Sequence, residues 1–180
     1  MNAKRNDGQP LGTVLRLGAV YSSRIKGNYE RLTHALARHR FIPVGSCLNR
    51  RTLVYNRDVA RAAALAVSHP SAAGRVFNVT DGGFHTLNKI IESICAALGR
   101  KPPSLSLPIG PVRFAAGIVE DLVRLVGRQA QISRATIEKY TEDIAVNSSR
   151  IQTELGFKPQ YDLRSGWQET VQEMRRMGEL

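Results

Sequence analysis

Two adjacent arginines, Arg50 and Arg51, stand near the start of the stretch N-R-R-T-L-V-Y-N-R-D-V-A at residues 49–60. They precede a β-branched and aromatic run, which leads through a turn into an alanine-rich helix pattern. Arginine offers a permanent charge and a rigid fork of donors, and a phosphate or diphosphate group accepts such a fork better than it accepts a lysine. The pair is therefore either a solvated surface feature or part of an anion site.

The net charge of +11, from 26 basic and 15 acidic residues, raises the question of a nucleic-acid partner. The charge is concentrated in residues 1–51, which carry ten Lys and Arg against two acids. No lysine-rich block occurs, and no aromatic residues interleave with a basic stripe as stacking platforms for bases. This pattern disfavours nucleic acid, and it fits a small anionic ligand or an acidic partner segment.

The remaining composition indicates a globular protein of the cytoplasm, and it supports neither a metal site nor a membrane span. The two cysteines form no CxxC or Cys/His cluster. No apolar run approaches the roughly 18 residues that span a bilayer, and the polar start lacks a signal-peptide core. We expect the histidines to be surface or packing residues, because none has a paired carboxylate or metal-like spacing: His34, His39, His69 and His85.

Strand and helix patterns alternate over the first hundred residues, and the later patterns are mostly helical, which predicts an α/β fold with parallel strands. Apolar runs bounded by turn residues predict strands at 13–21, at 41–45, in the run after Arg51, and at 75–80. The hydrophobic helix predicted around 111–126 is assigned to the core in preference to a membrane surface.

Capping residues mark the ends of the other predicted helices. The dipeptide His69-Pro70 ends the second of them, because the residue before a proline leaves the α region. A short capped helix lies within 147–159. The expected caps are Asn28, Asp58, Thr86 with Gly99, and the S-x-x-Q box of Ser165 and Gln168.

Six motifs follow one another in a recognisable order: V-L-R-L-G-A-V-Y-S, Asn28 before a helix, P-V-G-S, R-R-T-L-V-Y-N-R-D-V-A, G-R-V-F-N-V-T-D and N-S-S-R-I-Q-T-E-L-G-F-K-P. Over about residues 11–175 this order resembles the C-terminal, substrate-binding half of the extended short-chain dehydrogenase/reductases. Within that superfamily it is similar to the NAD-dependent epimerase/dehydratase group that acts on nucleotide sugars, typified by UDP-glucose 4-epimerase.

The resemblance implies a single partial domain over residues 1–180. The last strands of a Rossmann-like NAD(P)-binding sheet are expected within 11–100, and a mostly helical substrate-binding part within 101–180. The N-terminal Rossmann half is expected to be missing. The chain has no GxxGxxG or GxGxxG, and none of its five tyrosines has a lysine four places later. No residue is therefore assigned as catalytic, and we expect no turnover by the chain alone.

The resemblance also implies substrate contacts. Arg51 matches an arginine that contacts the substrate diphosphate, with a surface arginine as the alternative. Asn28 matches an asparagine that hydrogen-bonds the nucleotide sugar, although an ordinary helix N-cap explains it equally well. Val44 and Gly45 are expected to border the uracil, and Gly45 also suits a turn.

Three further segments either differ from the family's sequence pattern or concern its cofactor. Leu17 and Gly18 are expected near the nicotinamide of NAD or NADP. The family's R-P-G-D falls near residues 137–140, where this chain reads I-E-K-Y, so Arg134 or Lys139 is the expected substitute. The family's N-V-Y-G-P reads A-V-Y-S-S here, which favours a related epimerase or reductase over UDP-galactose 4-epimerase itself.

The leading hypothesis is the substrate-binding portion of an NAD(P)-dependent nucleotide-sugar epimerase/dehydratase that binds the diphosphate of a UDP-sugar. Alternatives are a fragment of an NAD(P)-dependent 4-keto-sugar reductase and a non-catalytic nucleotide-binding module, and the least favoured is a basic nucleic-acid-binding domain. The resemblance leaves a homodimer as one option for the assembly of the full-length enzyme. The identity of the sugar and the choice of NAD or NADP stay open.

Overall fold

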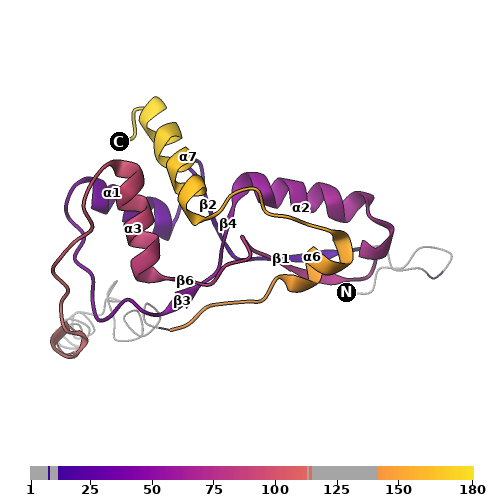
Figure 1. Cartoon of the computed structure of the whole chain (residues 1–180), viewed down its shortest axis with the longest axis horizontal. Coiled ribbons are helices and arrows are strands. Elements are labelled where there is room, and N and C mark those ends of the chain that lie inside the picture. Colours follow the sequence, from indigo (N-terminus) through magenta and orange to yellow (C-terminus); the bar gives the residue numbers. More distant parts are fainter. Residues whose placement is uncertain (1–7, 9–11, 113, 115–141) are drawn as a thin grey trace, which may run out of the picture.

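The computed structural model describes residues 8, 12–112, 114 and 142–180 (Figure 1). Strands and helices alternate through the first hundred residues, so the predicted α/β class is confirmed. The strands are β1 (Val14–Leu17), β2 (Ala19–Tyr21), β3 (Arg50–Arg51), β4 (Leu53–Tyr55), β5 (Val76–Val79) and β6 (His85–Thr86). The helices are α1 (Asn28–Ala37), α2 (Asn56–Ser68), α3 (Leu87–Leu98), α6 (Ser149–Leu155) and α7 (Leu163–Arg176), with a 3-10 turn at Pro70–Ala72.

The strand pairs are parallel where the sequence predicts parallel strands. β1 pairs with β5, and β2 pairs with β4. Gly18 lies between β1 and β2, and the chain changes strand partner there: the Gly18 amide donates to the Val79 carbonyl, whereas the next amide donates to the Thr52 carbonyl, each at 2.9 Å. A Cβ on Gly18 would lie 2.9 Å from that Thr52 oxygen, so this crossing requires glycine.

Two hydrophobic cores lie on opposite faces of the β2–β4 ribbon. Successive side chains of β4 alternate between them, because Leu53 and Tyr55 join the first core and Val54 joins the second. The first core packs β2 and β4 against α1, α3 and α7, and the second packs β5 against α2 and α6. Figure 1 shows the resulting elongated molecule, with α1, α3 and α7 gathered at one end and α2 and α6 at the other.

Helices cover only one face of the β1–β5 pair among the described residues. Phe77 and Val79 of β5 point into the second core. Val14 and Val76, which pair with each other, point to the opposite face and are exposed, Val14 to 52%. Parallel sheets usually carry cover on both faces, so this face is unusual.

Four predictions about local structure are wrong, and one of them is the Asn28 cap, because Gly27 is the N-cap of α1. The run 41–45 is no strand and contributes only a bridge between Val44 and Leu107. Asp58 is not a helix cap, because α2 begins at Asn56. The last helix begins at Leu163, and Asp162 rather than Ser165 is its N-cap.

The predicted caps of α3 are confirmed. The Thr86 hydroxyl accepts a hydrogen bond from the Lys89 amide at 3.3 Å, and Gly99 ends the helix in the left-handed region. Most of the predicted helix at 111–126 lies outside the described residues. No helix in the described part of the chain is long and apolar enough to cross a membrane.

Candidate functional site

The predicted cofactor residues Leu17 and Gly18 lie at the carboxyl ends of β1 and β5. Gly18 approaches the Thr52 backbone on one side, and a Cβ on it would lie 3.4 Å from the Thr80 methyl group on the other. Leu17 is 43% exposed, so it offers apolar surface beside this crossing. Ligands of open parallel sheets bind at the carboxyl ends of strands, where the strand order changes, and this edge meets that description.

Arg51 lies next to this crossing, because its neighbour Thr52 accepts the Ala19 amide. Arg51 is half-buried in β3, whereas Arg50 is exposed. Neighbouring side chains of a strand point to opposite faces, so the two arginines do not share a surface.

The charge of Arg51 also reaches α1. Burial raises the pKa of the Tyr29 hydroxyl, and the positive charge of Arg51 opposes that rise. Arg51 therefore lies near the first turn of α1, where the predicted substrate residue Asn28 is found.

Asn28 itself is exposed as the first residue of α1, and Gly27 occupies the N-cap position. The Asn28 side-chain oxygen accepts a hydrogen bond from Arg31 at 2.7 Å. The Gly27 amide donates to the Glu30 carboxylate at 3.3 Å, which satisfies the start of the helix without the Asn28 side chain. Helix capping is thus not the role of Asn28.

Val44 and Gly45 lie in a loop that meets residue Leu107. The Gly45 amide donates to the Leu107 carbonyl at 2.9 Å, and Gly45 has a φ of +73°, which suits a glycine turn. The other two predicted substrate residues, Arg134 and Lys139, lie outside the described residues.

His85 contradicts the expectation that no histidine has a carboxylate partner. Its Nε2 lies 2.7 Å from the Asp81 carboxylate, with the imidazole 17% exposed and the aspartate buried. In β6, His85 pairs with Arg51 across the antiparallel β3–β6 ribbon. The available signal was an Asp and a His four residues apart, flanking the turn at Gly82 and Gly83.

The buried tyrosines near the crossing are structural. Tyr21 stacks on Trp167 with ring centroids 4.5 Å apart, and burial raises the pKa of its hydroxyl. Burial also raises the pKa of Tyr55 to about 12. Both rings belong to the first core. No three His, Cys, Asp or Glu side chains of the described residues gather as a metal site.

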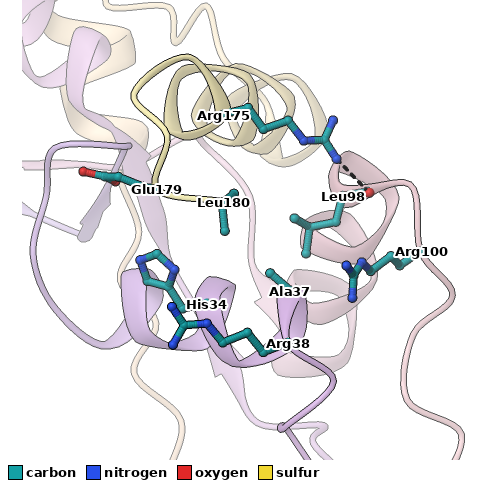
Figure 2. Close-up of a pocket in the computed structure, with 8 residues that line it drawn as sticks. All are labelled: His34, Ala37, Arg38, Leu98, Arg100, Arg175, Glu179 and Leu180. Atoms are coloured by element: carbon teal, nitrogen blue, oxygen red, sulfur yellow. Dashed lines mark hydrogen bonds between the residues drawn. The ribbon is translucent and has the colours of Figure 1, made fainter.

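A pocket of about 250 Å³ lies elsewhere, between the carboxyl ends of α1, α3 and α7 (Figure 2). Arg175 donates to the Leu98 carbonyl at 2.9 Å at its edge. Arginines at such a place offset the partial negative charge of helix C-termini. The pocket contains none of the predicted site residues, and its lining is His34, Ala37, Arg38, Leu98, Arg100, Arg175, Glu179 and Leu180.

The fold is α/β, with a strand crossing at the carboxyl ends of β1 and β5, and the comparisons give the relatives. No protein-family model matches the chain. It is 22% identical over 161 residues to the N-acetyl-α-D-glucosaminyl-diphospho-ditrans,octacis-undecaprenol 4-epimerase of Escherichia coli O157:H7, covering 89% of this chain and 48% of the relative. It is 25% identical over 160 residues to the UDP-glucose 4-epimerase of Vibrio cholerae, covering 88% and 45%.

Solved structures agree on the fold. The crystal structure of gox2253 superposes with a TM-score of 0.72 at 19% identity, covering 92% of this chain and 49% of that one. The UDP-glucuronic acid 4-epimerase of Bacillus cereus, in complex with UDP-glucuronic acid and NAD, gives a TM-score of 0.63 at 15% identity, covering 92% and 45%.

The chain is therefore similar to UDP-glucose 4-epimerase and related NAD-dependent epimerases and dehydratases, and the resemblance drawn from its motifs is confirmed. It spans about half the length of the curated relatives it matches.

Proposed function

We propose that this chain is the substrate-binding portion of an NAD(P)-dependent nucleotide-sugar epimerase or dehydratase, and that Arg51 binds the substrate diphosphate. The observation that carries the proposal is the position of Arg51. It is half-buried at the carboxyl-end crossing of β1 and β5, near the first turn of α1, while its neighbour Arg50 faces solvent. A forked, permanent cation in that position suits a diphosphate.

The names of the relatives support a sugar diphosphate as the ligand. One is a UDP-glucose 4-epimerase, and the other acts on a sugar joined through a diphosphate to undecaprenol. The two substrates share the sugar–diphosphate group and differ beyond it. Arg51 would bind the part that they share.

The cofactor fits the strand crossing in part. Leu17 offers apolar surface for a nicotinamide ring, and Gly18 has no side chain to obstruct it. When bound, NAD or NADP supplies hydride transfer at a sugar carbon. The printed sequence holds no glycine-rich phosphate loop and no Tyr-x-x-x-Lys pair. In our proposal those groups come from another polypeptide segment, and this chain contributes binding and orientation.

A non-catalytic nucleotide-binding module and a 4-keto-sugar reductase portion are the alternatives. The first predicts UDP binding with no turnover, even when a dinucleotide-binding half from a relative is added. The second predicts reduction of a 4-keto sugar in that reconstituted mixture, without interconversion of 4-epimers.

Titration calorimetry with UDP tests the role of Arg51. A charge-assisted hydrogen bond contributes about 1.5–3 kcal/mol, so Arg51→Ala should weaken binding about ten- to a hundredfold. Arg51→Lys should recover only part of this loss, because a point charge cannot reproduce the fork. Arg50→Ala is the matched control and should change little. Equal small losses at both positions would make the arginine pair a surface feature.

A further inference from the structure

The antiparallel register of β3 and β6 places Arg51 directly opposite His85. Opposed residues of an antiparallel pair project from the same face, with Cβ atoms about 5 Å apart. Arg50 is opposite Thr86 and projects from the other face. The ribbon thus presents an arginine and a histidine side by side on one face, and the second arginine on the other.

The His85 imidazole is held from one side by Asp81. The carboxylate of Asp81 accepts from the Gly83 amide at 3.0 Å with one oxygen and lies 2.7 Å from Nε2 with the other. The Asp81 amide donates to the Leu53 carbonyl at 2.7 Å, which ties this turn to β4. A Cβ on Gly83 would lie 2.6 Å from the imidazole, so the ring packs against a glycine that leaves it room.

This arrangement leaves the second ring nitrogen for a ligand. Within the described residues, Nδ1 of His85 has no hydrogen-bond partner, whereas Nε2 is occupied by Asp81. Nε2 can donate to Asp81 and Nδ1 to an anion at the same time when the ring carries both protons.

The backbone amides at the start of α3 already have hydrogen-bond acceptors and do not bind such an anion. The amides of Leu87 and Asn88 donate to the Asn49 and Cys47 carbonyls, and the Lys89 amide donates to the Thr86 hydroxyl. With these three donors used, an anion at this face has side chains as its partners.

We propose that His85 is a second anion-binding residue beside Arg51, that its Nδ1 donates a hydrogen bond to the phosphate oxygens that Arg51 binds, and that Asp81 is its positioning residue. This inference rests on the proposed function only in taking Arg51 as an anion-binding group. The ligand chemistry it requires is a diphosphate, whatever the diphosphate carries.

The test is titration calorimetry of the full chain with inorganic pyrophosphate. Gln places a nitrogen where Nε2 lies and has no counterpart of Nδ1, so His85→Gln keeps a donor to Asp81 and loses the ligand contact. We expect it to weaken binding about tenfold, with an unchanged unfolding temperature. Arg51→Ala should also weaken binding, and Arg50→Ala, on the opposite face, should not.

Nitrogen NMR of the imidazoles separates ligand contact from a structural role. On addition of pyrophosphate, the Nδ1 resonance of His85 should shift because this nitrogen gains a hydrogen-bond partner, and the resonances of the exposed His39 should not move. Asp81→Asn should reduce that shift while the chain stays folded, because the positioning carboxylate is gone.

The outcomes distinguish the two proposals. If Arg51→Ala weakens binding and His85→Gln does not, the role of His85 is overturned and the proposed function stands. If neither variant changes binding, or if pyrophosphate does not bind, both assignments are wrong. Weakened binding in both variants, with a shift confined to His85, supports the paired site.

Discussion

Two adjacent residues at the start of α2, Arg57 and Asp58, connect it to the segment that leads into α7. Arg57 forms ion pairs with Glu169 and Glu173 of α7, at 3.1 and 2.6 Å. Asp58 is fully buried and accepts hydrogen bonds from the amides of Gln160 and Tyr161, at 3.0–3.1 Å. The carboxylate therefore holds together elements about a hundred residues apart in the chain, a role that does not depend on any ligand.

Replacement of Asp58 should destabilise the fold without any effect specific to ligand binding. Asp58→Ala leaves two backbone amides without their acceptor and removes the ion pair to Arg61, so we expect a loss of about 2–4 kcal/mol in the free energy of unfolding. Asp143→Asn is the control, because that exposed side chain accepts one backbone amide and Asn can still accept it. Urea unfolding measures both, and a loss below that of the control would contradict the assigned role.

At the scale of single residues, the sequence indicated which residues could do chemistry better than it indicated their contact partners. Arg50 is exposed and Arg51 is half-buried, and the anion-binding role of Arg51 stays a prediction. The partners of Asp58 and His85 were missed for different reasons. Asp58 reaches residues about a hundred positions away, which local patterns do not encode. Asp81 and His85 are close in sequence, but their contact depends on the turn between them, in which Gly83 leaves room for the imidazole.

Among the elements, α7 shows how a capping pattern is misassigned by one turn. Ser165 was predicted as the N-cap, and it occupies instead the third helical position of a box whose cap is Asp162. The Asp162 carboxylate accepts the Ser165 amide at 2.7 Å, and the Ser165 hydroxyl accepts the Asp162 amide at 3.1 Å. Both residues are good caps, so the amphipathic face that packs Trp167 on Tyr21 decides the register.

The cap of α7 should make the stability of the fold depend on pH. Hydrogen bonds from the Ser165 side chain and backbone lower the pKa of Asp162. A carboxyl group with a lowered folded pKa stabilises the fold above its unfolded pKa of about 3.9, and this contribution is lost as the pH falls through the folded pKa. Asp162→Ala should therefore cost about 1 kcal/mol at neutral pH and less in acid.

Asp162→Asn is the matched variant, because Asn also caps helices but does not titrate. Its stability should stay close to that of the wild type at neutral pH. Denaturant unfolding from roughly pH 3 to 7 measures all three proteins. A deficit of Asp162→Ala that stays constant over this range would show that the charge contributes nothing.

Over the whole molecule, the fold class was predictable and the division of its interior was not. Alternating strand and helix patterns suffice for the α/β class, because they depend on local periodicity. The two cores depend on Gly18, where the chain stops pairing with β5 and starts pairing with β4. A lone glycine in an apolar run gives no sign of such a change. The uncovered face of β1 and β5 follows from the same topology.

That face should make the isolated chain associate at high concentration. Val14 and Val76 are exposed on this face of the β1–β5 pair, and the described residues place no second strand beside β1. An exposed apolar edge of this kind favours contact between copies, against the repulsion of a net charge of +11. Val14→Lys should shift association, measured by light scattering over a concentration series, to higher concentration. Val67→Lys adds the same charge at a site that is 89% exposed on α2, away from this face, and should change association less. An equal effect of the two lysines would mean that net charge alone governs association, and that the β1–β5 face takes no part in it.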